Sequence, residues 1–413
     1  MVVFDVRKMK DSGIEWIKEI PGNWAIMPNK YLMRKEKNIQ PVYHGEDILS
    51  LTMNGVIVRD LDAGGKMPTS FDGYQKIEKG NLLMCLFDID VTPRCVGLIK
   101  NNGLTSPAYS QFVLNDIAIP EYYCYYYTML DNDKTMLHLA KNLRHSLTEE
   151  QLGVIPTVVP PVSEQIKIAN FLDEKCAEID LLVNDIQQQI EVLEQYKRSV
   201  ITETVTKGLD PNVEMKDSGV QWIGRINANY EISRLKYIAD ILDEYRKPIT
   251  ADQRNQNSEI LYDYYGASGV IDKIDGYTID DHVMLIGEDG ANLKMRNLPI
   301  MYEVNGKAWI NNHAHILKPK ENVNFYYLFY MLEAMDINPY ITGSAQPKFN
   351  QEALKNMYVI VPDYKEQNSI CLYLQNRCRE IVQGIIEKNI CLEYLNEYKQ
   401  SVIYEYITGK RMI

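Results

Sequence analysis

The chain has 413 residues, of which 46% are hydrophobic and 24% are charged, and this composition is that of an ordinary globular protein with room for two domains. Its 56 acidic and 44 basic side chains give a formal net charge of −12, so any affinity for nucleic acid must come from local basic patches. The sequence has no apolar run of about 18 residues and no signal-peptide pattern, so we expect a cytoplasmic protein that does not span a membrane.

A short motif near the N-terminus occurs twice. Residues 9–17 read MKDSGIEWI and residues 215–223 read MKDSGVQWI, at an offset of 206. The Lys-Asp-Ser-Gly segment predicts a turn. We expect Trp16 and Trp222 each to pack that turn against its own domain rather than to bind a ligand.

Two blocks of similar size, residues 30–160 and 236–361, lie between the repeated segments. Runs of β-forming residues bounded by turns predict strands at 47–51, 80–86, 110–114, 283–286 and 313–317. An aromatic helix follows in each block, and the alignment at an offset of 202 places Tyr123 on Phe325, Tyr125 on Tyr327 and Tyr127 on Phe329. Each block then ends with a capped turn and a buried strand.

One uninterrupted helix is predicted from Ser163 to Thr206, because this stretch contains neither Gly nor Pro and repeats apolar residues every seven positions. We expect Ser163 to be its N-cap and Lys207-Gly208 to end it. At 1.5 Å per residue the helix is about 65 Å long. Its apolar seam consists of Leu172, Ile179, Ile186, Leu193 and Val200. A helix of this length with one apolar stripe needs a partner.

The partner is a second long helix after Pro362, which repeats the first at an offset of 202. Polar residues match as well as apolar ones, since Glu164-Gln165 falls on Glu366-Gln367. The seam of the second helix contains Leu374, Ile381, Leu395 and Val402. We therefore expect the two helices to pair along their seams. The chain then divides into a first globule (1–162), a central helix (163–207), a second globule (208–362) and a distal helix (363–413).

These duplicated features resemble one known family. The Lys-Asp-Ser-Gly-x-x-Trp-Ile opening, the GSAQPKFN loop at 343–350 and the Val-Pro-x-x-x-Glu-Gln entry into a long helix are similar to those of the specificity subunits of type I restriction–modification systems. The resemblance covers essentially the whole chain. Each motif alone is weak, whereas the duplicated order of all of them is specific.

The resemblance implies an α+β fold with two mixed α/β target recognition domains, separated by two long helices that form an antiparallel coiled coil with pseudo-twofold symmetry. Each domain would read half of a bipartite site on double-stranded DNA. The helix pair would set the gap between the half-sites and dock two modification subunits, and through them restriction subunits. The S-adenosylmethionine, ATP and Mg used by the complex would belong to those partners, so the chain itself would hold no cofactor and catalyse nothing.

Candidate DNA contacts are basic and amide side chains in the two blocks. Arg, Gln and Asn make bidentate hydrogen bonds to base edges, whereas Lys mainly contacts phosphate. The segment 141–145 occupies the place that 343–347 occupies in the second block. Neither block is basic overall, since residues 1–162 carry 17 basic against 19 acidic side chains and residues 208–362 carry 15 against 21. The candidates are Arg59, Lys66, Lys76, Arg94, Lys141, Arg144, His145, Lys294, Arg296, Lys307, Asn311, Asn312, Gln346 and Lys348.

Two other classes of function stay open at this point. A non-catalytic coiled-coil protein could recognise proteins or glycans through its tyrosine-rich modules. An enzyme could use paired carboxylates such as Asp88 with Asp90 or Asp280 with Asp281, although no acid–base constellation surrounds them.

The motifs of nucleotide, methyl-transfer and metal chemistry are absent or incomplete. No GxxxxGK[ST] loop occurs, and the segment 338–340 reads Asn-Pro-Tyr, one proline short of a methyltransferase loop. His313 and His315 lack a third metal ligand, and the seven cysteines form no CxxC pair, which indicates reduced core thiols. We expect no metal site.

Overall fold

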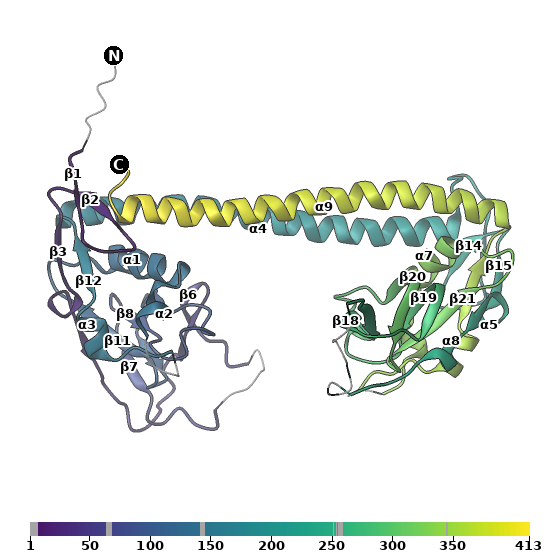
Figure 1. Cartoon of the computed structure of the whole chain (residues 1–413), viewed down its shortest axis with the longest axis horizontal. Coiled ribbons are helices and arrows are strands. Elements are labelled where there is room, and N and C mark those ends of the chain that lie inside the picture. Colours follow the sequence, from purple (N-terminus) through teal and green to yellow (C-terminus); the bar gives the residue numbers. More distant parts are fainter. Residues whose placement is uncertain are drawn as a thin grey trace, which may run out of the picture. The chain divides into compact units, whose positions relative to one another are not determined.

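The computed structural model describes residues 7–62, 68–140, 145–250, 252, 254, 259–343 and 346–413. The chain forms two compact units: unit 1 comprises Met1–Ile186 with Asn389–Ile413, and unit 2 comprises Gln187–Lys388. Each unit therefore contains one mixed α/β globule and one half of each long helix (Figure 1). No helix among the described residues is long and apolar enough to cross a membrane.

The elements of the first block and the helix that follows it are short strands, short helices and one very long helix. They are β1 (Met9–Asp11), β2 (Glu19–Pro21), β3 (Ala25–Pro28), η1 (Asn29–Tyr31), β4 (Met33–Glu36), β5 (Leu49–Thr52), β6 (Gly55–Val58), β7 (Gln75–Ile77), β8 (Leu82–Met84), β9 (Val96–Leu98), β10 (Gly103–Thr105), β11 (Ser110–Leu114), α1 (Pro120–Asn132), α2 (Thr135–Leu139), α3 (Glu149–Gly153), β12 (Pro156–Val159) and α4 (Val162–Lys207).

The second half of the chain is built in a similar way, with longer strands in its central sheet. Its elements are β13 (Met215–Asp217), β14 (Arg225–Asn227), β15 (Glu231–Arg234), α5 (Leu235–Ile238), β16 (Ala239–Ile241), η2 (Asp243–Tyr245), β17 (Tyr262–Gly266), β18 (Gly269–Ile274), β19 (Ile279–Gly287), α6 (Asn292–Met295), β20 (Met301–Ile310), β21 (Ala314–Pro319), α7 (Phe325–Ala334), η4 (Asn338–Tyr340), α8 (Gln351–Asn356), β22 (Tyr358–Val361) and α9 (Tyr364–Ile407).

The central sheets of the two units have the same strand order. The order β4-β11-β8-β9 in unit 1 corresponds to β16-β21-β19-β20 in unit 2, where β17 and β18 extend the sheet to six strands. Their registers correspond too, because Leu82 faces Phe112 in unit 1 and Met284 faces Leu317 in unit 2. Each unit also has a separate antiparallel pair whose second strand directly precedes a long helix. The pairs are β3 with β12 before α4, and β15 with β22 before α9.

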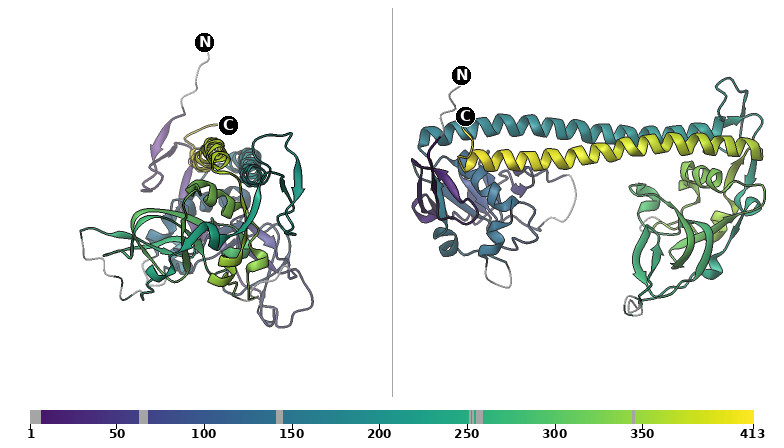
Figure 2. Two further views of the ribbon diagram at one scale, coloured as in Figure 1. Left: turned by 90° about the vertical axis from the view of Figure 1, so that its right-hand side faces the viewer. Right: turned by 45° about the horizontal axis from the view of Figure 1, so that its top comes forward.

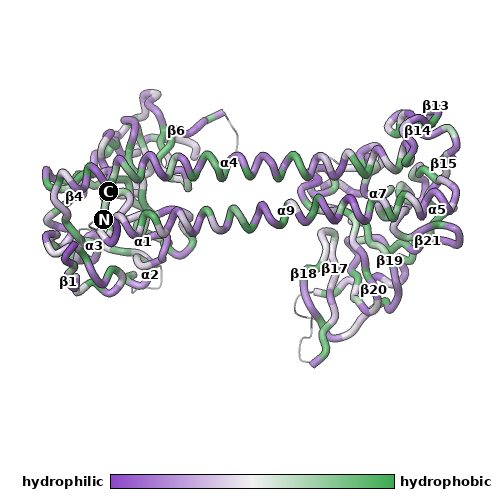
Figure 3. Tube along the Cα trace, turned by 90° about the horizontal axis from the view of Figure 1, so that it is seen from above, coloured by the Kyte–Doolittle hydropathy of each residue, from purple (hydrophilic) through white to green (hydrophobic). Residues whose placement is uncertain are grey.

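The two long helices run antiparallel within each unit. In unit 1 the rings of Phe171 and Tyr406 lie 4.4 Å apart, and Lys399 Nζ lies 2.6 Å from an Asp180 carboxylate oxygen, so residue numbers rise along α4 as they fall along α9. In unit 2 the Arg377 guanidinium donates to the Tyr196 hydroxyl at 2.9 Å, and Lys388 donates to Gln189. Figure 2 shows α4 and α9 side by side from two directions, and Figure 3 shows that hydrophobic and hydrophilic residues alternate along both.

The seam residues are covered to different degrees. Leu172, Ile179, Val200, Leu374, Ile381 and Val402 are buried, whereas Ile186, Leu193 and Leu395 are half-buried. Leu182 and Tyr196, which interrupt the heptad pattern, are exposed. Side chains that also meet a globule lose more solvent contact than those covered by the other helix alone.

The start of α4 differs from the sequence prediction by one residue. The helix begins at Val162, and the backbone amides of Glu164 and Gln165 donate to the Pro161 carbonyl. Ser163 is therefore inside the first turn and is not the N-cap. The C-terminal end agrees with the prediction, since Gly208 follows Lys207 with a φ of 85° that suits a glycine.

The repeated Glu-Gln pair ties each long helix to its own globule. The Gln165 side chain accepts from the Ile119 amide and donates to the carbonyls of Ile117 and Pro160, all at 2.8 Å. In unit 2 the Gln367 side chain accepts from the Asn324 amide at 2.8 Å and donates to the Pro362 carbonyl at 3.0 Å. Both glutamines are buried, so they satisfy backbone groups that water does not reach.

The aromatic helices α1 and α7 correspond in a register different from the predicted one. The buried aromatic positions of α1 are Tyr122, Tyr123, Tyr126 and Tyr127, and the buried positions of α7 are Tyr327, Leu328, Met331 and Leu332. Tyr122 thus matches Tyr327, and the predicted match of Tyr123 with Phe325 is wrong. Helical burial repeats at three and four residues, whereas the predicted alignment followed aromatic residues at every second position.

The duplicated turn is present in both units. Gly13 and Gly219 adopt positive φ, and each follows an Asp whose carboxylate accepts from the glycine amide. Trp16 packs against the core of unit 1. The Trp222 ring lies 5.3 Å from that of Tyr340. Both tryptophans contact their own unit, as predicted.

Candidate nucleic-acid interface

One edge of the unit 2 sheet gathers several of the predicted DNA contacts. This edge consists of the end of β19, the start of β21 and the loop 346–350, and the Phe349 amide joins the loop to it by donating to the Glu288 carbonyl at 2.7 Å. Lys348 Nζ lies 3.2 Å from Glu288 Oε1, and Lys294 Nζ donates to the Gly343 carbonyl at 3.3 Å. Gln346 is exposed on the same loop. Lys294, Gln346 and Lys348 are therefore neighbours here.

Asn311 and Asn312 lie at the same edge but in different settings. Asn311 is 4% exposed, and its side-chain oxygen accepts from the His313 amide at 2.8 Å. This oxygen holds the turn before β21, and the buried side chain is not presented at the surface. Asn312 is exposed and offers its side chain to solvent.

Two further candidates in unit 2 lie away from this edge. Arg296 donates from Nη2 to the Glu333 carbonyl at 2.6 Å, so it joins α6 to α7 instead of facing a ligand. Lys307 lies on β20 with Nζ 4.5 Å from the centre of the Tyr277 ring, a cation–π contact. The sequence pattern grouped these residues with Lys348, but the tertiary structure separates them.

In unit 1 the structure describes four of the seven candidates. His145 lies at the position equivalent to the unit 2 loop, because its carbonyl accepts from the Ile89 amide and Leu147 donates to Leu86 as Phe349 does to Glu288. His145 Nδ1 is 3.0 Å from Asp90 Oδ2, and this bond holds the pKa of Asp90 below its ordinary value. Lys66, Lys141 and Arg144 lie outside the described residues.

The other three described candidates of unit 1 are scattered. Arg94 donates to Asn132 at 2.9 Å and lies 3.5 Å from the buried carboxylate of Asp131, so it ties β9 to α1 and is not free to reach a base. Lys76 is exposed on β7, and Arg59 is half-buried just after β6. Of the described candidates in unit 1, only His145 shares the location of the unit 2 loop.

Residues that the sequence analysis missed lie directly beneath the unit 2 loop. Arg246 contacts the carboxylates of Glu288 and Asp243, the latter at 3.1 Å. His315 is fully buried, with Nδ1 2.7 Å from Asp243 Oδ2 and Nε2 2.8 Å from the Phe349 carbonyl oxygen. We call Asp243, Arg246, Glu288 and His315 the ionic cluster. The His-x-His pattern marked His315 in the sequence, but no spacing or motif joins it to the other three residues, because the four come from three separate segments.

The ionic cluster keeps its carboxylates charged. Burial raises the pKa of Asp243, but the hydrogen bond from His315 and bonds from the Ile316 amide and Gln351 outweigh it, so the pKa lies below its ordinary value. Burial also raises the pKa of Glu288. Arg246, His315 and Lys348 lower this pKa by more, so it too lies below its ordinary value. These carboxylates therefore stay ionised at neutral pH.

The incomplete chemical motifs have structural roles. His313 Nδ1 bonds Asp289 at 2.7 Å and His315 bonds Asp243, so neither histidine is a vacant ligand. The Asn-Pro-Tyr segment is η4, whose Tyr340 hydroxyl accepts from the Tyr358 amide. Asp281 pairs with Lys318. Within the described part of the chain, no group of three or more His, Cys, Asp or Glu side chains could hold a metal ion.

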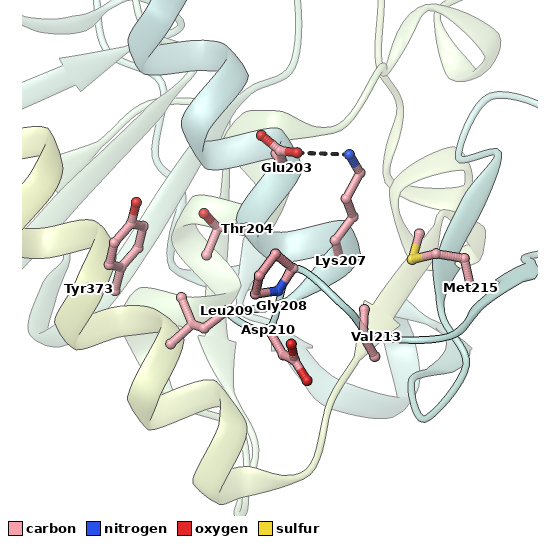
Figure 4. Close-up of a pocket in the computed structure, with 10 residues that line it drawn as sticks. Glu203, Thr204, Lys207, Gly208, Leu209, Asp210, Val213, Met215 and Tyr373 are labelled. Carbon is pink, nitrogen blue, oxygen red and sulfur yellow. Dashed lines mark hydrogen bonds and ion pairs between the residues drawn. The ribbon is translucent and has the colours of Figure 1, made fainter.

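A surface pocket lies where α4 ends in unit 2. Figure 4 shows its lining of Glu203, Lys207, Leu209, Met215 and Tyr373. The Lys207 ammonium is 2.7 Å from the Glu203 carboxylate, so these two charged side chains of the pocket pair with each other. The pocket brings together no acid–base or phosphate-binding set.

Comparisons with known proteins agree with this architecture. Residues 227–388 match the family model described as the type I restriction modification DNA specificity domain. A Haemophilus influenzae protein named as a type I restriction enzyme specificity subunit is 32% identical over 136 residues, which are 33% of this chain and 34% of that protein. The MjaVIII type I restriction enzyme specificity subunit of Methanocaldococcus jannaschii is 24% identical over 274 residues, 61% of each chain.

A solved chain from a study of the assembly and conformational transition of a type I R-M system has the same fold, with a TM-score of 0.70 at 13% identity over 95% of this chain and 99% of that chain. The matched regions span 34% and 61% of the Haemophilus and Methanocaldococcus relatives. The residues that match the family model lie in unit 2, and the fold of the chain is that of the solved type I R-M chain.

Proposed function

We propose that this chain is the DNA sequence-specificity subunit of a type I restriction–modification complex. Residues 1–162 and 208–362 act as target recognition domains, each reading one half of a bipartite site on double-stranded DNA. The observation that carries the proposal is the duplication of one skeleton, on which equivalent loops lie at the same sheet edge: His145 in unit 1 and Gln346 with Lys348 in unit 2. Two related readers suit two half-sites of one duplex.

The long helices set the gap between the half-sites and dock two modification subunits, and restriction subunits join through these. Exposed apolar side chains on the helices support docking, among them Leu181 and Tyr394 in unit 1 and Val192 and Leu372 in unit 2. The partners supply S-adenosylmethionine, ATP and Mg chemistry in the cytoplasm. The chain itself is the non-catalytic reader.

The acidic composition bears on affinity. Since neither recognition domain is basic overall, the subunit alone binds DNA weakly, and the partner subunits supply much of the phosphate contact. Gel-shift titrations of the isolated chain and of the assembled methyltransferase, at one stated salt concentration, compare the two directly.

The function is tested by expressing the chain with a modification subunit and mapping adenine methylation by single-molecule sequencing. We expect one bipartite motif with a gap of fixed length. Methylation without such a motif, or specific capture of a protein or glycan without any DNA binding, contradicts the proposal and favours the interaction-protein alternative.

The loop assignment is tested with Lys348→Ala and Arg144→Ala in the assembled enzyme. Both variants should weaken DNA binding, and Lys348→Ala should lower the slope of log affinity against log salt by about one. Lys320→Ala is a matched control, because Lys320 follows the other end of β21 and pairs with Asp240 at 3.5 Å. Unchanged affinity in both loop variants removes the loops from the interface.

The gap-setting role is tested by inserting four residues near Thr202, which lengthens the helix by about 6 Å, or about two base-pair steps. Methylation mapping should return the same two half-sites with a wider gap. Changed half-sites would show that the helix does not act as a spacer.

A further inference from the structure

We propose that the ionic cluster of Asp243, Arg246, Glu288 and His315 positions the loop 346–350 and so determines how strictly unit 2 discriminates its DNA half-site. The proposal rests on the proposed function, because it deepens the role of that loop. None of the four side chains needs to touch DNA; they act through Gln346 and Lys348.

The cluster joins three segments that are distant in the sequence. Arg246, next to η2, contacts Glu288 from the end of β19 and lies 3.1 Å from Asp243. Asp243 Oδ2 in turn lies 2.7 Å from Nδ1 of His315 on β21. The Asp243 carboxylate also accepts from the Ile316 amide at 3.1 Å. These bonds fix the sheet edge as one rigid platform.

The platform holds the loop at several points. His315 Nε2 bonds the Phe349 carbonyl at 2.8 Å, and Glu288 accepts the Phe349 amide through its backbone and the Lys348 ammonium through its side chain. Gln351, which follows the loop, donates to Asp243 Oδ2 at 2.8 Å. The loop is thus attached to the cluster at Lys348, Phe349 and Gln351, while the Lys348 side chain stays 54% exposed.

The cluster is costly to bury and is not needed for the sheet. The side chains of His315, Asp243, Glu288 and Arg246 are 0%, 7%, 12% and 17% exposed. Buried ion pairs lose much of their attraction to desolvation, so apolar residues would stabilise the same fold equally well. A charged set in this position therefore indicates a requirement for fixed geometry.

Unit 1 supplies the internal comparison. Its backbone pairing places Leu86 at the position of Glu288 and Ser110 at that of His315. The same strands form there without those charges, and the exposed His145 side chain pairs with Asp90. The ionic cluster thus belongs to what distinguishes the two readers, not to the skeleton they share.

The test uses the full chain assembled with its modification subunit and carrying Arg246→Gln, which removes the charge that holds Asp243 and Glu288 together. We expect methylation of sites with one wrong base pair in the unit 2 half to rise about tenfold relative to the intact site, which is the scale of one lost base discrimination. The unit 1 half-site and the gap should stay unchanged. Glu288→Gln, which keeps the side-chain shape, should relax the same half-site.

Arg254→Gln is the matched control, because Arg254 forms a half-buried pair with Asp272 of β18 at 3.1 Å. It should leave both half-sites as strict as before. A merely structural role predicts a lower melting temperature for Arg246→Gln and Glu288→Gln with unaltered discrimination, and that result overturns the proposal. If the unmodified chain directs no bipartite methylation at all, the proposed function itself fails, which is a different outcome from intact methylation with unaltered strictness.

Discussion

Units 1 and 2 have the same skeleton but different loop supports. In both, a buried glutamine at the start of a long helix holds the aromatic helix, and an acidic residue before it accepts from an aromatic side chain: Trp24 donates to Glu164 and Tyr230 donates to Glu366. These pairs survive the duplication because they satisfy buried backbone and ring groups, which every copy of the fold must do.

The two units differ in the residues at the sheet edge beneath the loop, although their strand order is the same. Unit 2 buries charges beneath its loop, whereas unit 1 has Leu86 and Ser110 at the matching positions. Unit 2 also extends its sheet with β17 and β18, whereas unit 1 forms the separate pairs β5 with β6 and β7 with β10. Variation is thus concentrated at the edges and loops, where a change alters recognition with little effect on packing.

The largest expected effect is a loss of stability when the buried glutamine that both units share is replaced. Gln165→Ala and Gln367→Ala each leave buried backbone groups without partners, so each should destabilise its own unit by about 3 kcal/mol. Hydrogen exchange of the α1 and α7 amides, measured with denaturant, reports each unit separately. If Gln165→Ala destabilised unit 2 as much as unit 1, the two units would not unfold independently.

A smaller effect distinguishes the two glutamates. Glu164 accepts from Trp24 and also pairs with Arg7 at 2.5 Å, whereas the Glu366 carboxylate accepts from Tyr230 at 3.0 Å. Glu164→Gln should therefore cost about 1.5 kcal/mol and Glu366→Gln about half as much. Chemical denaturation of both variants tests the ranking, and the reverse order would mean that Arg7 contributes nothing.

The smallest effect concerns acid stability. The pKa values of Asp243 and Glu288 are lowered in the folded protein, so their contribution is complete above the ordinary carboxyl pKa of about 4 and is lost as pH falls toward the lower folded values. Glu288→Gln should flatten the acid limb of the unit 2 stability curve between about pH 5 and 3, with little change for unit 1. Hydrogen exchange at several pH values measures both limbs, and an equally steep limb in the variant contradicts the assignment.

The sequence by itself determined the tandem duplication, the two long helices, the repeated turn and five of the strands in the two blocks, because these features depend on local periodicity and on residues repeated at constant spacing. It also singled out the loop with Gln346 and Lys348. Its errors were local: the aromatic register followed composition instead of helical burial, and Ser163 was mistaken for a cap.

Only the tertiary structure decided which candidates lie together. Arg94, Arg296 and Asn311 carry the right chemistry for DNA, yet their side chains are engaged by Asn132, by the Glu333 carbonyl and by the His313 amide. The ionic cluster unites η2, β19 and β21 across more than 70 residues, as the bond between Asp243 and Ile316 shows. Local patterns do not encode such pairings. A charged side chain can be buried only where the folded chain brings an oppositely charged or hydrogen-bonding partner to it.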